Sequence, residues 1–535
     1  MVTEQPVSLA VRQRVLLAAV LVGHVCLAWT VRAREIFTFG DDAAYLLLAR
    51  SLRGFSYREV QFITEPIAAR FPPGYPALLA FLGTLFGERL DVIAGMGILF
   101  SVVGLIALFD VIRRRWSPEL ALLVTAICAV NPTLVEVAGA PVTEATFTGL
   151  LLCSLWAADW SERTSPSGRR AMLAGALAIS AALVRSAGVT IPLSLGAHWL
   201  LRRRVRWVVA LGLASSLTVG SWLAWTAMAP KREVRRSYVD DAIDVRTAEG
   251  SFANTLVHRI KTNVTAYGGQ MVFTELKLPL NPSTVFDNVF WMAIIGGAAV
   301  IGTVSAWRRW NAVIVFSVTY GALLTVWPYN LERFLAPVLP VIIALTVIGA
   351  GIVATRIEQS ARLRTGARLL VPSLGVLLTA PAILNDSSLV ERTEACTRAR
   401  VDCARPASLD FIDAARFAAT HTPPSARFIV PKNATLYYFA QRQSVFWEEV
   451  LQQDTTSFLA YLQRQRITHI LGTPVYSDYQ TVFRLVLHDC DRFDVMRAYS
   501  QETMLLALRA TPRTDGESGP ACVAMRRALI RKPVT

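Results

Sequence analysis

The sequence predicts a mainly α-helical polytopic membrane bundle of about eleven spans plus juxtamembrane helices, followed by a C-terminal soluble α/β domain. Three observations predict this fold class. Of the 535 residues, 53% are hydrophobic and only 17% are charged, against roughly 25% charged in typical soluble domains. Apolar runs of spanning length recur between residues 15 and 385. After residue 385, shorter helix-like and strand-like stretches alternate.

The predicted spans are apolar runs of about 20 residues, the length that a bilayer core requires. The first run, 15–31, is interpreted as an uncleaved helix, because many spans follow it and residues 31–33 form a poor signal-peptide cleavage site. Segments 171–186 and 188–201 are short, so we expect them to be tilted or broken near Arg185. The remaining predicted spans are 91–112, 118–136, 141–160, 207–228, 287–306, 311–328, 334–354 and 369–385.

Short arginine clusters between the spans set the predicted orientation, because cytoplasmic loops carry an excess of Lys and Arg. The net charge of +15 is therefore attributed to topology, and nucleic acid is not an expected partner. The clusters share one side only if residues 74–87 do not cross. We therefore predict that 41–53 and 74–87 are juxtamembrane or re-entrant helices on the outer face. The N-terminus is then cytoplasmic, and the first loop 32–90 and the loop 230–286 are outside.

The predicted division is a transmembrane domain, 1–385, and an extracytoplasmic α/β domain, 386–535. The tail contains no glycine-rich phosphate loop and no nucleophile elbow, so a lid or docking role is expected for it. Its four cysteines are compatible with two disulfides in an oxidising compartment, whereas four free thiols would indicate a cytoplasmic tail. These disulfide candidates are Cys396, Cys403, Cys490 and Cys522.

Two adjacent carboxylates, Asp41 and Asp42, open an apolar helix directly after Gly40. The helix dipole favours an acid at this position by roughly 0.3–1 kcal/mol, and a single acid would satisfy that purely structural role. Neighbouring side chains on a helix point about 100° apart, so one acid can cap the helix while the other faces the bundle. We therefore expect a functional role for at least one of them.

Other charged residues fall on the same predicted outer face. Glu144 opens the fourth span, where it either complements the helix dipole or needs a charged partner near the top of the bundle. Arg70 and Arg333 each precede a proline-containing segment. Arg70 can be an interfacial arginine, and Arg333 can form a local ion pair with Glu332. Alternatively, the planar guanidinium of either residue can bind a phosphate. Arg185 lies where the two short spans meet.

Several segments occur in a characteristic order along the chain. After the first span come "GDDAAY" (40–45), "RFPPGYPALLAFLGTLFG" (70–87), "NPTLVEVAGAPVTEATF" (131–147), "VRSAG" (184–188) and "ERFLAPVLP" (332–340). This ordered set resembles the GT-C superfamily of polytopic glycosyltransferases, over about residues 10–385. Within it the chain looks most like bacterial members akin to protein O-mannosyltransferases and to the aminoarabinose transferase of lipid A. No single segment is diagnostic.

The resemblance implies a mannosyltransferase-like enzyme of the cell membrane that uses a polyprenyl-phosphate sugar, without a nucleotide sugar, and acts on its non-cytoplasmic face. The acceptor is a hydroxyl of unknown class. Asp41 corresponds to the catalytic acid, Asp42 to its neighbour, which is usually Glu in the family, and Glu144 to the second acid. The expected donor-phosphate ligands are Arg70, Arg333 and Arg185, and the expected substrate-binding residues are Tyr45, Glu65, Tyr75 and Tyr329.

The expected chemistry needs one carboxylate as base for the acceptor hydroxyl, a role typically worth 10²–10⁴-fold, and arginines where the phosphate departs. No cofactor is required. Asp41, Asp42 and Glu144 could hold a divalent metal, but no spacing demands one. The main alternative function is a polyprenyl-lipid or solute transporter or flippase, which would more often show inverted repeats. The third function considered is that of a non-enzymatic scaffold for envelope assembly.

Overall fold

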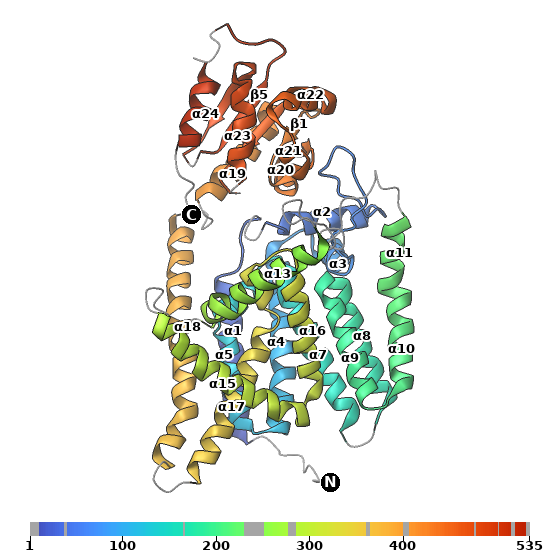
Figure 1. Ribbon diagram of the computed structural model, residues 1–535, viewed down its shortest axis with the longest axis vertical. Coiled ribbons are helices and arrows are strands. Elements are labelled where there is room, and N and C mark those ends of the chain that lie inside the picture. Colours follow the sequence, from blue (N-terminus) through green and yellow to red (C-terminus); the bar gives the residue numbers. More distant parts are fainter. Residues whose placement is uncertain are drawn as a thin grey trace.

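A computed structural model of the chain shows a long helical bundle with a smaller α/β domain at one end (Figure 1). The N-terminal end of α1 (Val11–Thr30) lies at the opposite end of the bundle. The structure describes residues 10–36, 40–163, 166–228, 251–276, 285–359, 364–399, 406–475, 478–500, 502–514 and 519–530.

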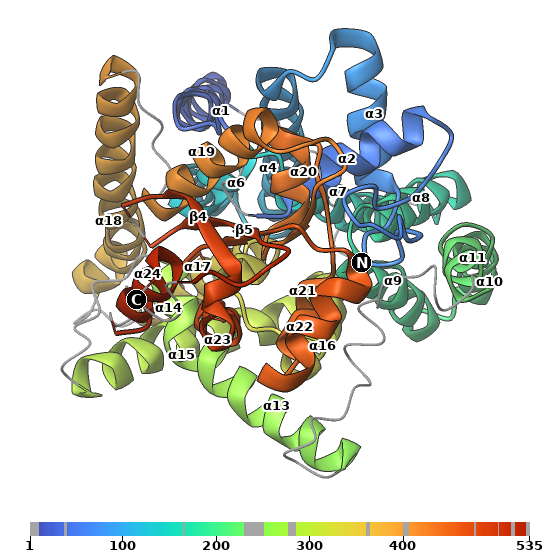
Figure 2. The same ribbon diagram turned by 90° about the horizontal axis from the view of Figure 1, so that it is seen from above.

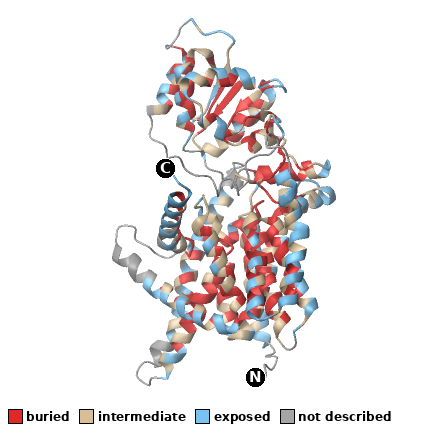
Figure 3. Cartoon of the chain, turned by 45° about the vertical axis from the view of Figure 1, so that its right-hand side comes forward, coloured by how far each residue is buried: buried red, intermediate tan, exposed pale blue. Residues whose placement is uncertain are grey.

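Each predicted apolar run coincides with one or more helices of the bundle. After α1, these helices are α4 (Leu90–Arg115), α5 (Pro118–Ala129), α6 (Pro132–Ala138), α7 (Thr143–Glu162), α8 (Gly168–Val184), η1 (Ser186–Val189), α9 (Thr190–Leu201), α10 (Val205–Ser215), η2 (Ser216–Gly220), α11 (Ser221–Met228), α15 (Val285–Arg309), α16 (Asn311–Val326), α17 (Leu339–Glu358) and α18 (Arg364–Ala399). Their outward faces carry exposed apolar side chains and their inward faces are buried (Figure 3). That distribution is expected of a bundle surrounded by lipid.

The predicted number of about eleven spans is not confirmed. Within the described ranges, five helices are long and apolar enough to cross a membrane, and the α5–α6 pair, bent by 65°, makes a sixth if it is one span. One reason is that α8 has 17 residues and α9 has 12, or about 26 and 18 Å at 1.5 Å per residue. Both are shorter than a hydrocarbon core of roughly 30 Å.

Two short helices, α2 (Asp42–Arg53) and α3 (Gly74–Phe86), pack together at the end of the bundle that faces the α/β domain (Figure 1). Helix α3 has 13 residues and is about 20 Å long, too short to span. Gly74 allows α3 to approach α8, because a Cβ there would lie 2.7 Å from the main-chain carbonyl of Leu183.

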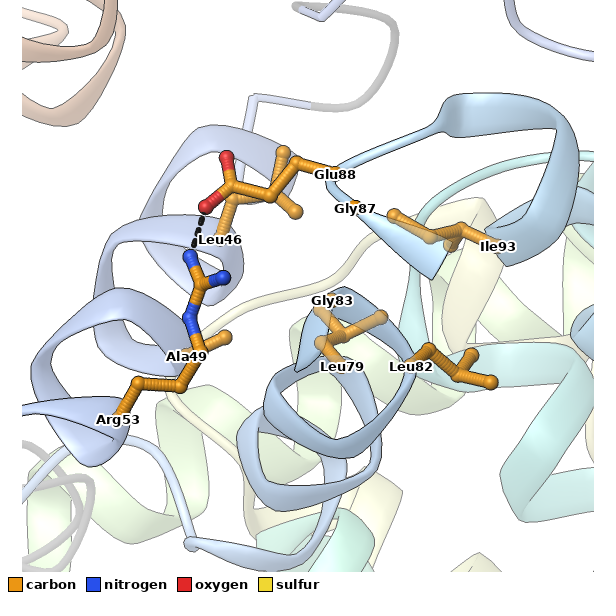
Figure 4. A pocket seen from close by; sticks show the side chains of 9 residues that line it. All are labelled: Leu46, Ala49, Arg53, Leu79, Leu82, Gly83, Gly87, Glu88 and Ile93. Carbon is orange, nitrogen blue, oxygen red and sulfur yellow. Dashed lines mark hydrogen bonds and ion pairs between the residues drawn. The ribbon is translucent and has the colours of Figure 1, made fainter. Parts of the chain in front are cut away.

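An ion-pair cluster fixes the other end of this helix pair. Glu88, which follows α3, binds both Arg50 and Arg53 of α2, with Arg50 Nη2 2.7 Å from the carboxylate. The Arg53–Glu88 pair borders a small, mostly apolar pocket between α2, α3 and the start of α4 (Figure 4). The cluster therefore ties α2 to the segment that leads into α4.

The predicted boundary at residue 385 lies inside α18, which continues to Ala399. The apolar run ends at residue 385, and the polar residues after it remain helical. Of the predicted outer loop 230–286, the structure describes residues 251–276 and the first residues of α15; the rest lies outside the described residues. Residues 251–276 contain α13 (Phe252–Ala266), η5 (Tyr267–Met271) and α14 (Val272–Glu275).

The C-terminal domain is an α/β layer around a five-stranded sheet of order β2-β1-β3-β5-β4. Its strands are β1 (Arg427–Ile429), β2 (Gln443–Ser444), β3 (His469–Gly472), β4 (Phe493–Ala498) and β5 (Met504–Leu508). β1 pairs in parallel with β2 and β3, whereas β5 is antiparallel to β3 and β4. The helices are α19 (Pro406–His421), α20 (Asn433–Ala440), α21 (Trp447–Leu451), α22 (Thr455–Gln465), α23 (Tyr479–His488) and α24 (Pro520–Ile530).

One disulfide, between Cys490 and Cys522, joins η7 (Cys490–Arg492) to α24. Of the other two candidates, Cys403 and the side chain of Cys396 lie outside the described residues.

The first loop attaches the α/β domain to the bundle. Phe62 pairs in parallel with Ser444 of β2. The Ser444 amide donates a hydrogen bond to the Gln61 carbonyl at 3.0 Å. The Ile63 amide donates one to the Ser444 carbonyl at 3.1 Å. The rings of Phe62 and Phe446 lie 4.2 Å apart. Seen from above, the domain lies over the middle of the bundle, and its helix α20 packs against α2 (Figure 2).

Candidate active site

Asp41 directly precedes α2, yet its side chain makes no capping hydrogen bond to that helix. It is instead bound by the guanidinium of Arg333, which lies 292 positions along the chain. Arg333 belongs to η6 (Glu332–Leu335), the short turn that leads into α17. The first acid of the pair is thus held by an ion pair between the first loop and a distant element.

Glu144 lies in the first turn of α7 and is 1% exposed. Arg185, between α8 and η1, places Nη1 2.7 Å from Oε1 of Glu144 and donates to Oγ1 of Thr143 at 2.8 Å. Nε of Arg333 lies 3.8 Å from the same Oε1. Arg333 therefore bridges Asp41 and Glu144, and two acids and two arginines from four elements form one network.

Three of these charged residues, Asp41, Arg185 and Arg333, line a cavity that opens to solvent, and the empty space of about 570 Å³ between its walls includes part of that solvent. The rest of the wall is mostly apolar or aromatic, and it consists of Tyr45, Phe71, Pro72, Val184, Ser186, Ala187, Tyr320, Leu323, Leu324, Trp327 and Phe334. A pocket with a few converging charges and an apolar wall suits a ligand that has a charged head and an apolar chain.

Burial favours the neutral form of the Asp41 carboxyl and by itself would raise its pKa. The positive charges of Arg333, Lys432 and Arg70 outweigh that effect, so the pKa of Asp41 lies below its ordinary value. Asp41 is therefore ionised at neutral pH and able to accept a proton.

The other predicted residues take different places. Tyr45 lines the cavity and packs edge-on against Phe71 and Tyr75, with ring centroids 5.0 and 5.1 Å apart. Tyr75 is only 1% exposed and supports Tyr45 from behind. Nη2 of Arg70 lies 3.4 Å from the hydroxyl of Tyr329.

Two predicted residues, Asp42 and Glu65, do not line the cavity. Asp42 is fully buried, and its Oδ1 accepts a hydrogen bond from the Ala43 amide at 2.9 Å. Glu65, expected to contact substrate, accepts from Nε2 of Gln443 at 2.9 Å and lies against the α/β domain instead. The first loop folds back onto that domain, which draws Glu65 away from Asp41.

Two residues near the cavity were not predicted. Tyr320, a polar side chain in an otherwise apolar run, lines the wall, and its place in a predicted span is the signal that could have found it. Lys432 comes from the α/β domain and lies 3.4 Å from the carbonyl of Gly40. No local motif marks Lys432, because its position depends on the docking of two domains.

The expectation that Asp41, Asp42 and Glu144 could hold a divalent metal stays a prediction. Across the described ranges, no group of three or more His, Cys, Asp or Glu side chains is arranged to hold one. Both Asp41 and Glu144 are neutralised by arginine, and a guanidinium lies between them where a shared metal would have to bind.

Comparison with protein-family models and with curated proteins found no match. Solved structures do match. ArnT from Cupriavidus metallidurans bound to undecaprenyl phosphate aligns with a TM-score of 0.54 and 16% identity, over 94% of this chain and 99% of that one. The apo form of the same protein aligns with a TM-score of 0.57 and 15% identity, over 92% of this chain and 97% of that one. A third structure is the oligosaccharyltransferase AglB from Archaeoglobus fulgidus in complex with an inhibitory peptide and a dolichol-phosphate. It aligns with a TM-score of 0.55 and 10% identity, over 94% of this chain and 75% of that one.

This chain shares its fold with ArnT and AglB. The match to ArnT covers nearly the whole of both chains and so includes the α/β domain as well as the bundle. The GT-C resemblance expected from the ordered segments is thus confirmed for the fold, and the tail, where the resemblance of the segments was weak, is part of the match.

Proposed function

We propose that this GT-C protein is a membrane glycosyltransferase that moves a sugar from a polyprenyl-phosphate donor to a hydroxyl acceptor on the non-cytoplasmic face. The observation that carries the proposal is the cavity in which ionised Asp41 meets Arg333 and Arg185 beside an apolar wall. A transferase of this kind needs a base, cations for the leaving phosphate and room for a prenyl chain. The Asp41 carboxylate, the two arginines and the apolar wall of the cavity support this proposal.

The arginines suit the donor phosphate. A guanidinium forms two parallel hydrogen bonds to phosphate oxygens, and Arg333 and Arg185 both face the cavity, with Arg70 close to Asp41. The prenyl chain would follow the apolar wall that Leu323 and Leu324 provide. Structures with this fold have been solved with undecaprenyl phosphate and with a dolichol-phosphate, the product expected once the sugar has left.

Asp41 would act on the acceptor. As the acceptor oxygen bonds to the anomeric carbon, its proton passes to the Asp41 carboxylate, the bond between that carbon and the phosphate oxygen breaks, and the phosphate leaves as an anion. Arg333 binds Oδ2 of Asp41, and a carboxylate has several lone pairs, so Oδ1 is the atom we assign to the proton. The arginines stabilise the charge that develops on the phosphate.

The decisive variant is Asp41→Asn, which keeps the shape of the side chain and removes the base. We expect transfer to fall by about 10²–10⁴-fold, measured as release of radiolabelled sugar from a polyprenyl-phosphate sugar by protein reconstituted in lipid. Asp413→Asn, at a 63% exposed carboxylate on α19, is the matched control and should retain activity. Full activity in Asp41→Asn would refute the assignment.

The same reconstitution separates the proposal from the alternatives. A transporter or flippase would move the intact labelled lipid between leaflets and release no sugar. A scaffold would do neither, and substitutions of Asp41, Glu144 and Arg70 would all be silent. Release of sugar that depends on Asp41 distinguishes the transferase from both.

A further inference from the structure

We propose that Lys432 of the α/β domain is a positioning residue for Asp41, so that the transfer step requires this domain to be docked. The inference rests on the proposed function and extends it, because it assigns to the C-terminal domain a part in the chemistry of the site. A lid or docking role without catalysis is what the sequence alone led us to expect of that domain.

The geometry around Gly40 carries the proposal. Lys432 precedes α20, and its Nζ donates to the carbonyl of Gly40 at 3.4 Å. Gly40 has a φ of +80°. A Cβ at this position would collide with Nζ of Lys432 and lie 3.0 Å from Cε. Glycine therefore serves two purposes here, since it adopts the left-handed backbone and leaves room for the ammonium beside Asp41.

The position of Lys432 is fixed by contacts on both sides of the domain interface. The next residue, Asn433, donates its side-chain amide to Oγ of Ser444 at 2.7 Å and to the carbonyl of Val445 at 2.9 Å. Ser444 in turn pairs through its backbone with the first loop at Gln61. A continuous chain of hydrogen bonds thus connects Lys432 to the loop that carries Asp41.

A second contact holds α20 over α2. The guanidinium of Arg50 lies 4.8 Å from the ring centroid of Tyr438 on α20, within the range of a cation–π interaction. Because Asp41 immediately precedes α2 and Lys432 immediately precedes α20, this contact also fixes the distance between the two residues.

Asp41 is flanked by cations from two domains. Arg333 approaches from the bundle and Lys432 from the α/β domain, and both favour the ionised carboxylate. When a donor phosphate competes for Arg333, Lys432 keeps a positive charge beside Asp41. The charged and titratable groups around Asp41 are Arg333 on η6, Lys432 before α20, Arg70 in the first loop, Asp42 and Tyr45 on α2, and Glu144 and Arg185 beyond Arg333.

The test is the pH dependence of sugar transfer by the full-length protein with a radiolabelled polyprenyl-phosphate sugar. A base is active above its pKa and is lost as the pH falls through it. Lys432→Met removes a charge that lowers the pKa of Asp41, so we expect the acidic limb of kcat/KM to move to higher pH. Lys432→Gln, which can still donate to Gly40, should show the same shift, and Lys432→Arg should restore the wild-type limb.

Arg416→Gln is the matched control. It also removes one cation from the interface of the same domain, but Arg416 pairs with Glu35 at 3.0 Å and does not face Asp41. Its acidic limb should coincide with that of the wild type. Limited proteolysis and thermal unfolding of each variant report whether the domain remains folded and docked.

The outcomes separate the two proposals. If the wild-type protein releases no sugar, the proposed function fails. The wild type can instead be active while the acidic limb of kcat/KM in both Lys432→Met and Lys432→Gln stays at the wild-type pH. In that case the positioning role is overturned, whatever the transfer rates of the two variants, and the proposed function stands. A limb that moves equally in Arg416→Gln would also overturn it, because the effect would then follow loss of docking and not loss of the charge.

Discussion

Glu144 holds two arginines at the base of the cavity without lining it. It is almost fully buried, and its Oε1 is shared by Arg185 and Arg333. The sequence assigned Glu144 to catalysis as a second acid. Its position favours another role, in which it orients from behind the two guanidinium groups that we propose as ligands of the donor phosphate.

Glu144→Gln should therefore weaken binding of the donor more than it slows sugar transfer in the bound complex. Removing one partner of a buried ion pair costs about 3–5 kcal/mol of folding stability, and the arginines lose their fixed orientation. We expect KM for the donor to rise and the unfolding temperature to fall, measured by sugar release and by thermal unfolding in detergent. A large fall in kcat at unchanged KM would instead support direct catalysis.

Glu162→Gln is a matched control at the other end of the same helix. Glu162 is 17% exposed and lies 3.4 Å from His198 and 3.8 Å from Arg202, away from the cavity. It should leave KM for the donor unchanged.

At the level of residues, the sequence indicated a set of charged groups on one face but not how they pair. Asp41 and Asp42 look equivalent in sequence, since both open the same helix, and only the packing of α2 turns Asp41 towards Arg333 and buries Asp42. Arg185 was identified from a break between two short apolar runs. Lys432 could not be predicted, because no local pattern encodes a contact between the domains.

Among the elements, α3 depends on its close approach to α8. Gly74→Ala should push α3 away, because the new methyl would lie 2.7 Å from both the carbonyl carbon and the oxygen of Leu183. Overpacking of this kind costs about 1–3 kcal/mol, so the unfolding temperature should fall. Activity should fall too, since Tyr75 of α3 supports Tyr45.

Gly95→Ala on α4 is the comparison for this variant, because no atom lies within 4 Å of its added Cβ. It should leave stability unchanged or raise it slightly through helix propensity, by up to about 1 kcal/mol. Equal stability of Gly74→Ala and Gly95→Ala would show that α3 is free to move away from α8.

The apolar runs predicted the helices of the bundle well, whereas two strands of the α/β domain, β2 and β4, leave no regular alternation in the sequence. β2 has only two residues, too few to show an alternating pattern. β4 has a bulge between Val495 and Arg497, which breaks the alternation on which strand prediction depends. The number of spans stays unconfirmed, because apolarity alone does not reveal whether a helix is long enough to cross.

The whole molecule has chemically different ends. At the end opposite the α/β domain, Arg115 and Arg163 both pair with Asp159, at 2.7 and 2.6 Å, and Arg309 donates to the carbonyl of Arg115 at 2.9 Å. The α/β domain at the other end contains the Cys490–Cys522 disulfide. An arginine-rich end is typical of the cytoplasmic side, and a disulfide is typical of an oxidising compartment.

These two features predict that the α/β domain and the Asp41 cavity lie on the non-cytoplasmic side. In sealed right-side-out membrane vesicles, added protease should remove a C-terminal tag and leave an N-terminal tag intact, because only the former is exposed. Inside-out vesicles are the control and should reverse the pattern. A C-terminal tag that survives in right-side-out vesicles would place the cavity in the cytoplasm. The arginine clusters would then face outwards, and the donor lipid would have to be reached from the inner leaflet.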